Sequence, residues 1–170
     1  GYDSFKYSRN TLGEKHQTAV ATNDVETLNT LESIKKLYGF DNLPQHRACN
    51  VSQDLAQQIE SALGFSFPSN TGVFVQVVDC ENTFIHTDGG SRKASFYYML
   101  TDDSDAETRF YKSDNPPIYS TIWNPMDVYQ YYSYTMKHHH WHTFSHDEIH
   151  SVNNVKRLRV GLLIDMTRSF

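Results

Sequence analysis

The sequence has few cysteines and no long apolar run. Only Cys49 and Cys80 occur among 170 residues, which gives neither a disulfide framework nor a repeated metal-binding spacing, so both are expected to stay thiols in a reducing compartment. No stretch approaches the roughly 18 apolar residues of a membrane span, and the start at Gly1 lacks the layout of a signal peptide. The sequence therefore predicts a soluble, intracellular (cytoplasmic) protein with no membrane partner.

An excess of positive charge is also missing. The chain has 15 Lys and Arg and 20 Asp and Glu, which gives a net charge of −5. This charge makes nucleic acid an unlikely partner and favours a small molecule or another protein. The length suits a single domain, 1–170. A hydrophobic content of 38% with 14% aromatic residues is typical of a globular chain that favours β-structure.

The first part of the chain, 1–70, is predicted to be an N-terminal arm followed by supporting helices. Residues 1–21 are polar with scattered aromatics and are expected to form an arm or an edge strand. Asn23 and Glu26 resemble a capping box, and apolar residues recur at helical spacing up to Gly39. A second helix is expected from the N-cap Ser52 to Gly64.

From residue 71 to 170 the pattern predicts a β-core. A buried strand is expected at 73–78, a short strand at 83–86, and a close turn at Gly89-Gly90. Strands 95–100 and 108–111 are expected to form a hairpin around the acidic run 101–105. Further strands are expected within 128–136, at 141–144 and at 157–164, the last two flanking a turn that carries His150. Helices followed by short strands predict a mostly β fold, a sandwich or barrel covered by helices on one side.

The motif His86-Thr87-Asp88 suggests a metal site. Side chains two positions apart in a strand point the same way, so His86 and Asp88 can aim at one ion. A third ligand from a distant strand would complete the two-histidine, one-carboxylate set that suits non-haem Fe(II) and leaves open positions.

The third ligand must be chosen from a crowded segment, because 138–150 holds six of the nine histidines. His150 stands out because a polar turn comes directly after it, and then an apolar strand that carries Arg157 and Arg159. A buried arginine is costly unless an anion pairs with it. We therefore expect a negatively charged group beside this strand.

Taken together, these residues form a recognisable pattern: His86, Asp88, Phe144, His150-Ser151-Val152 and Arg159, nine positions after His150. The pattern resembles the Fe(II)- and 2-oxoglutarate-dependent oxygenases, especially the prolyl 4-hydroxylase-like branch, over roughly residues 72–166. The resemblance implies a double-stranded β-helix core (a jelly roll, cupin-like) packed against two helices.

The resemblance also implies roles for individual residues. His86, Asp88 and His150 would bind Fe(II), and Arg159 would hold the distal carboxylate of 2-oxoglutarate, with Arg157 as the competing candidate. Arginine suits this role because its planar fork can bind a carboxylate through two hydrogen bonds. The implied reaction uses O2 to hydroxylate a protein side chain (prolyl type) or a small amino-acid-like substrate and releases succinate and CO2. Ascorbate would be an additional cofactor.

The family pattern further places Ser95, Tyr97 and Met99 on the inward face of their strand, with Tyr97 and Ser95 beside the co-substrate. A register shift of one residue would instead turn Phe96 and Tyr98 inward. The sequence departs from the family pattern at two places. Gly161 stands where many members carry a small hydroxyl residue, and 106–108 lacks the glycine-rich element that is usual before the following strand.

Two other functions fit the sequence. One is a cupin-like metal enzyme that uses His86 and His150 with His142 or His146 and does not use 2-oxoglutarate. The other is a non-catalytic, metal-binding interaction protein on the same scaffold, with the histidine tract as a surface patch.

Overall fold

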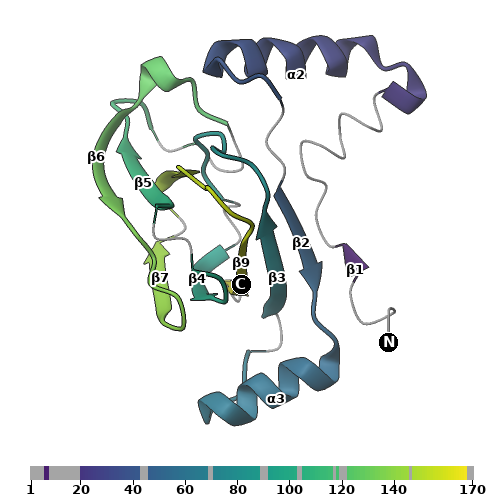
Figure 1. Cartoon of the computed structure of the whole chain (residues 1–170), viewed down its shortest axis with the longest axis vertical. Helices are drawn as coiled ribbons and strands as arrows, with labels where there is room; N and C mark the ends of the chain where they lie inside the picture. The colour runs from purple at the N-terminus through teal and green to yellow at the C-terminus, as the bar shows by residue number, and fades with distance from the viewer. Residues whose placement is uncertain are drawn as a thin grey trace.

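Most of the chain forms β-strands in two sheets (Figure 1). The computed structural model describes residues 6–7, 20–42, 46–68, 71–88, 92–102, 105–116, 118, 122–145 and 147–167. The predicted Gly89-Gly90 turn and most of the N-terminal arm lie outside the described residues.

The larger sheet has six antiparallel strands. In spatial order they are β1 (Lys6–Tyr7), β2 (His46–Asn50), β3 (Gly72–Val78), β9 (Arg159–Thr167), β4 (Arg92–Met99) and β7 (Trp141–Ser145). The strands β3 and β9 pair along their whole shared length, from Gly72 opposite Asp165 to Val78 opposite Arg159. This long pairing places the carboxyl-terminal strand at the centre of the sheet.

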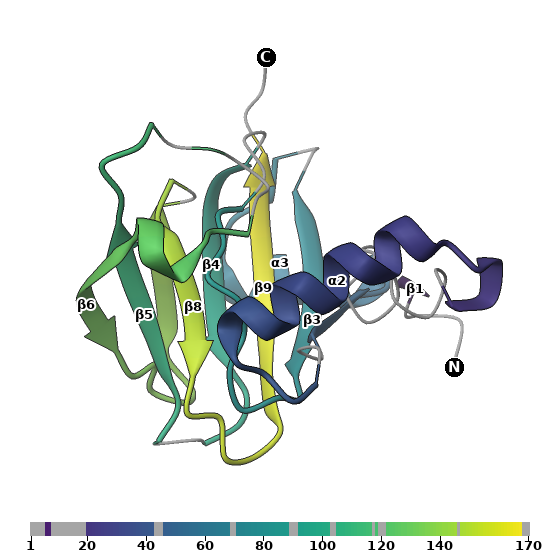
Figure 2. The same cartoon turned by 90° about the horizontal axis from the view of Figure 1, so that it is seen from above.

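The smaller sheet has three antiparallel strands: β6 (Tyr129–Tyr134), β5 (Glu107–Lys112) and β8 (Ile149–Asn153). From β3 onward the chain crosses repeatedly between the sheets (Figure 2). Strands β4 and β5 belong to different sheets, and β8 of the small sheet comes between β7 and β9 of the large sheet in the sequence. This order is consistent with the predicted jelly roll. The mostly β character of the chain is confirmed.

Three local predictions are wrong. The hairpin between 95–100 and 108–111 does not form, since β4 pairs with β7 and β9 while β5 pairs with β6 and β8. His150 lies within strand β8 rather than in a turn. Segment 83–86 forms no regular strand, and only His86 makes bridges, to Ile122 and to His150. Alternation of side chains predicts strands but does not reveal their partners, which explains the first error.

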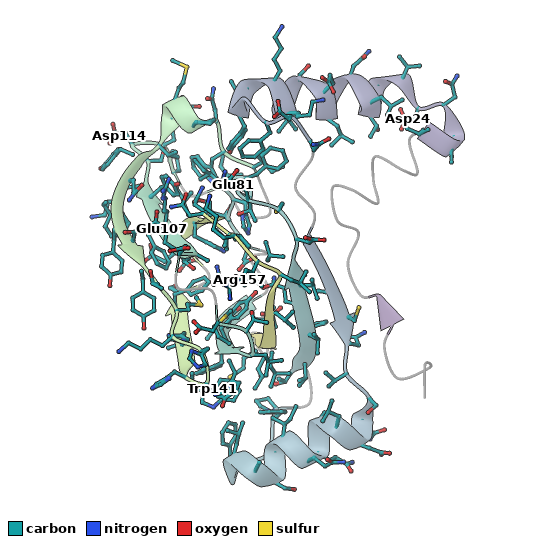
Figure 3. All side chains as sticks on the ribbon, viewed as in Figure 1. Asp24, Glu81, Glu107, Asp114, Trp141 and Arg157 are labelled. Carbon is teal, nitrogen blue, oxygen red and sulfur yellow. The ribbon has the colours of Figure 1, made fainter. Side chains whose placement is uncertain are left out.

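The two predicted helices are present. Helix α2 (Val25–Tyr38) ends at Gly39, whose φ of 68° is left-handed, and α3 (Gln53–Leu63) begins after the N-cap Ser52. The N-cap of α2 is Asp24 and not Asn23 (Figure 3). The Asp24 carboxylate accepts the Thr27 N–H at 3.1 Å, whereas Asn23 takes a left-handed φ of 53°.

The helices do not cover one side of the sheets together. Figure 1 places α2 and α3 at opposite ends of the molecule. In α2 only Leu31 is buried, and α3 contains no buried residue. Strand β2 was not predicted, because its five residues mix small, polar and basic side chains without a clear apolar face. Among the described residues, no helix combines the length and the apolar character needed to cross a bilayer.

The core between the sheets depends on large side chains of the central strands. Leu163, in the middle of β9, is 2% exposed, and Phe110 of β5 is 7% exposed. Leu163→Ala should therefore lower the free energy of unfolding by about 2–5 kcal/mol, through lost apolar contact and the cavity left behind. Urea denaturation measures this change. Leu158→Ala is the control, because Leu158 is 50% exposed and should change stability by no more than about 0.5 kcal/mol.

Candidate metal site

Three potential metal ligands converge between the two sheets. The ligand atoms of His86, Asp88 and His150 all lie within 4.8 Å of one another. The two histidines become neighbours because their backbones pair, with N–O distances of 2.9 Å in both directions. Their ring centroids are 4.4 Å apart. The set predicted from the sequence is therefore brought together, and its role in metal binding remains a prediction.

Backbone carbonyls fix the ring orientation of both histidines. His86 Nδ1 lies 2.9 Å from the carbonyl oxygen of Phe84, and His150 Nδ1 lies 2.9 Å from that of Glu148. A carbonyl oxygen can only accept, so each Nδ1 carries the proton and donates it. Each Nε2 is then left with a lone pair for a metal ion, which is the usual orienting arrangement for ligating histidines.

The surroundings of His150 favour its neutral form. His150 is buried, at 6% exposure. Burial, followed by the positive charge that His86 can carry, lowers the pKa of His150 to about 4, against an opposing effect of Asp88. Metal coordination requires neutral imidazole, so His150 is ready to bind an ion at neutral pH without first losing a proton.

The donor set fits a divalent transition-metal ion. Two imidazole nitrogens and one carboxylate suit Fe(II) and leave coordination positions open. Ligand atoms about 2.1 Å from one ion are at most about 4.2 Å apart, so small side-chain rotations would close the set around an ion.

The middle residue of the motif holds the segment in place. Thr87 is 3% exposed. Its hydroxyl donates to the carbonyl of Ile118 and accepts the indole N–H of Trp123 at 3.4 Å. Because Thr87 is anchored on the side away from the pocket, His86 and Asp88 point together into it.

Helix α2 supports the same segment through its last residue. The hydroxyl of Tyr38 accepts the N–H of Ile85 at 3.2 Å and donates to the carbonyl of Trp123. The ring of Tyr38 meets Phe84 edge to face, with centroids 4.7 Å apart, and burial raises the pKa of Tyr38. Sequence reasoning did not identify Tyr38 as a supporting residue, because its partners are backbone groups 47 and 85 positions away. It also missed Trp123, whose indole N–H donates to Thr87, 36 positions away.

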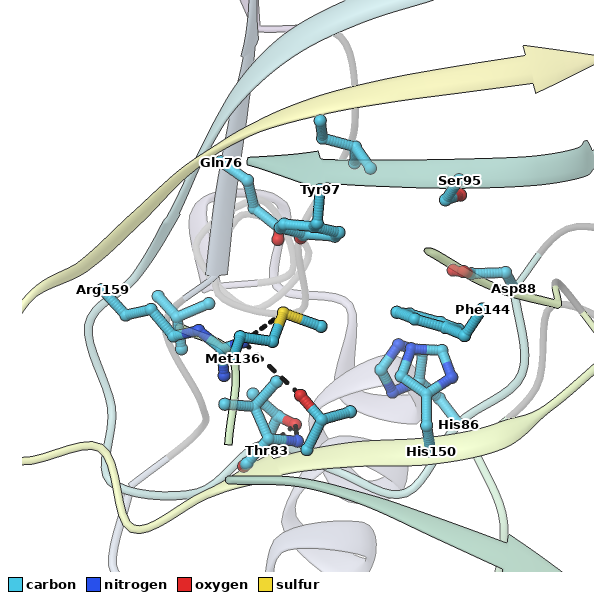
Figure 4. A pocket seen from close by; sticks show the side chains of 14 residues that line it. Gln76, Thr83, His86, Asp88, Ser95, Tyr97, Met136, Phe144, His150 and Arg159 are labelled. Carbon is cyan, nitrogen blue, oxygen red and sulfur yellow. Dashed lines mark hydrogen bonds between the residues drawn. The ribbon is translucent and has the colours of Figure 1, made fainter. Parts of the chain in front are cut away.

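Arg159 lies at the opposite end of the same pocket from the three ligands (Figure 4). Its guanidinium is buried, and Nη2 lies 3.4 Å from the hydroxyl of Thr108 and 3.2 Å from the sulfur of Met136. These are neutral groups and weak acceptors for a cation, so a carboxylate would be a stronger partner. Arg157 is exposed and does not line the pocket.

The inward face of β4 follows the predicted register. Ser95 and Tyr97 line the pocket, and Met99 is buried. Ser95 donates to the buried carboxylate of Asp165 at 2.7 Å. A Cβ added at Gly161 would lie 3.2 Å from the Tyr97 ring, so the ring takes the space of a side chain there. Contact of Ser95 and Tyr97 with a co-substrate stays a prediction.

No family model matches this chain. No curated protein matches its sequence either. Among solved structures, the chain is similar to a sugar phosphate isomerase from a cupin superfamily of Silicibacter pomeroyi, at 13% identity and a TM-score of 0.35. The match covers 72% of this chain and 60% of that one, so this chain spans less than two thirds of that protein. At this level of similarity, activity and fold must be judged from the contacts and the strand order of the chain.

Of the two alternative third ligands, only His142 belongs to the described residues. His142 does not line the pocket, and its nitrogens bind other groups, Nδ1 at 3.1 Å from the Tyr134 hydroxyl and Nε2 at 2.9 Å from the Lys137 carbonyl. His146 lies outside the described residues.

The anchoring of Thr87 generates a prediction. Thr87→Val keeps the side-chain shape but removes the hydroxyl, so the motif should lose its fixed orientation and the affinity for Mn(II) should fall about tenfold or more. The EPR signal of free Mn(II) measures this affinity. Thr30→Val, on the exposed face of α2, is the matched control and should leave binding unchanged. Equal Mn(II) affinity in the two variants would contradict the anchoring role.

The lowered pKa of His150 predicts an acid-sensitive fold in the metal-free protein. The unfolded chain binds a proton near pH 6.5, whereas the folded chain resists protonation until about pH 4. The free energy of unfolding should therefore decrease as the pH falls from 6.5 toward 4. Urea denaturation in the presence of a chelator, at several pH values, measures this slope. His150→Gln should flatten it, and an unchanged slope would assign the effect to other groups.

Proposed function

We propose that this protein is an Fe(II)- and 2-oxoglutarate-dependent dioxygenase. The observation that carries the proposal is the pairing, in one pocket, of the set His86, Asp88 and His150 with the buried guanidinium of Arg159 at the other end. A dicarboxylate with a 2-oxo group can bind a metal at one end and an arginine at the other. The proposal treats the β-core as a double-stranded β-helix.

In this proposal the chain binds and orients, and the metal supplies the redox chemistry. His86, Asp88 and His150 would hold Fe(II) on one side, which leaves positions for 2-oxoglutarate and O2. Bound iron would couple the conversion of 2-oxoglutarate and O2 to succinate and CO2 with hydroxylation of a substrate. The substrate would be a protein side chain, of prolyl type by the resemblance, or a small amino-acid-like molecule, with ascorbate as an additional cofactor.

Arg159 would hold the far carboxylate of 2-oxoglutarate. Its Nη1 is buried and has no hydrogen-bond partner among the described residues, and a carboxylate accepts two guanidinium donors in parallel. Tyr97 lies beside Gly161, the position at which the family that the sequence resembles carries a small hydroxyl residue. Its phenol would lie near the same end of the pocket. Burial of this end strengthens a carboxylate–guanidinium contact relative to one in water.

Anaerobic spectroscopy tests this function directly. Addition of Fe(II) and 2-oxoglutarate without O2 should produce the visible charge-transfer band of the chelate, and later admission of O2 should yield succinate. Absence of the band in folded, iron-loaded protein would overturn the proposal. Iron binding without the band would favour a cupin-like enzyme that does not use 2-oxoglutarate, and a band without succinate for any substrate would favour a non-catalytic binding protein.

The choice of arginine gives a paired prediction. Arg159→Ala should weaken 2-oxoglutarate binding by about 10- to 100-fold, since a hydrogen bond to a charged group contributes about 1.5–3 kcal/mol. Titration of the band measures the affinity. Arg157→Ala is the matched control, because Arg157 is exposed on the same approach to β9 and its loss should leave the affinity unchanged. The reverse result would make Arg157 the anchor.

A further inference from the structure

A groove lined by aromatic side chains runs between the edge strands β6 and β7. Tyr131, Tyr132 and Tyr134 reach it from β6, Trp141 and His142 from β7, and Glu148 from the residue before β8. The three tyrosines and Trp141 are 36–52% exposed, and Figure 3 labels Trp141 beside β7. So many exposed aromatic rings in one concave place are typical of a binding surface.

The lining of the groove carries one carboxylate. Glu148 carries the only formal charge among the described residues that line it, and its carboxylate accepts a hydrogen bond from the Tyr131 hydroxyl at 2.7 Å. Both ring nitrogens of His142 have partners, since Nε2 lies 2.9 Å from the Lys137 carbonyl oxygen and Nδ1 lies 3.1 Å from the Tyr134 hydroxyl. Aromatic faces beside a carboxylate attract cations rather than anions.

One ring of the groove already contacts an ammonium group. The Nζ of Lys112 lies 4.7 Å from the centroid of the Tyr131 ring. Lys112 is not among the residues that line the groove, so this ammonium contacts Tyr131 from outside it. The contact is one example, on this strand, of a tyrosine face that holds a basic side chain.

The groove borders the metal pocket. Met136 and Phe144 line both. The ring of Phe144 meets His150 edge to face, with centroids 4.9 Å apart, and Met136 contacts Arg159. A ligand in the groove is therefore separated from the candidate metal ligands by single side chains.

The strands that border the groove favour an extended peptide. In the described part of the chain, β6 is the terminal strand of the small sheet and β7 the terminal strand of the large sheet. Each terminal strand offers one row of backbone N–H and C=O groups to a chain that lies along it. A free small cation would use the rings and Glu148 but not these rows.

We propose that the groove binds an extended peptide substrate through a lysine or arginine side chain, held by the tyrosine rings, Trp141 and Glu148. This inference rests on the proposed function for the reaction at the metal, and it narrows the substrate to a peptide with a basic residue near the modified position. The acidic net charge of the chain, −5, favours the approach of such a peptide.

The test uses the full chain and two short peptides of alanine and glycine, identical except for a central lysine or norleucine. In ¹⁵N-correlated NMR spectra the indole N–H of Trp141 should shift with the lysine peptide, whereas that of the buried Trp123 serves as an internal reference. We expect the lysine peptide to bind about tenfold more tightly than the norleucine peptide. The difference should shrink at high salt.

Glu148→Gln should remove most of this discrimination while keeping the backbone carbonyl that orients His150. Asp147→Asn is the matched control, because Asp147 is the adjacent exposed acid and does not line the groove. Equal affinity for lysine and norleucine peptides, or an unshifted Trp141 signal at millimolar peptide, would overturn the proposal. Free lysine amide that binds as tightly as the peptide would overturn the peptide part.

The two proposals fail separately. Peptide binding needs neither Fe(II) nor 2-oxoglutarate, so a selective shift of Trp141 in a protein that forms no charge-transfer band would retain the groove and reject the dioxygenase. A charge-transfer band in a protein that does not discriminate between the peptides would retain the dioxygenase and reject the groove.

Discussion

The candidate site depends on one pair of backbone hydrogen bonds, those between His86 and His150. Each residue donates to the carbonyl of the other at 2.9 Å, and this bridge attaches an otherwise irregular segment to strand β8. Thr87 and Tyr38 fix the same segment from its other side through Ile118, Trp123 and Ile85. Because the bridge is made by backbone atoms, both imidazoles remain available to a ligand, and their orientation comes from carbonyls two residues back.

The pocket contains an unusual balance of charges for a protein interior. The guanidinium of Arg159 is buried at one end, where Nη2 contacts a hydroxyl and a thioether and Nη1 has no hydrogen-bond partner among the described residues. At the other end, burial keeps His150 neutral. A ligand that brings negative charge to Arg159 and a metal ion that brings positive charge to Asp88 would each improve the local electrostatics, which is why the two halves of the proposed function support one another. The aromatic groove adds a third, separate region whose charge is set by Glu148.

Several elements could be predicted from sequence because their signals are local. Gly39 and Gly64 ended helices as expected, since a left-handed residue after a helix favours glycine. The inward face of Ser95, Tyr97 and Met99 agrees with the register that the family resemblance implied, because the two-residue period of a strand by itself allows either face to point inward. The hairpin around 101–105 was wrong and β2 was missed, because strand pairing depends on distant partners. The cap of α2 shifted from Asn23 to Asp24, since both residue types can cap and only the geometry of the first turn selects one.

The sequence by itself determined the residue types of the site: an H-x-D motif, a later histidine and an arginine in an apolar strand. The sequence also favoured His150 and Arg159, and only the tertiary structure shows that both line one pocket with His86 and Asp88, whereas Arg157 and His142 do not. Spacing along the chain does not show which side chains face the interior. The structure shows this for both residues, because His150 lies in β8 and Arg159 lies in β9 opposite Val78. The groove between β6 and β7 was likewise absent from the sequence analysis, because it exists only where the edges of two sheets meet.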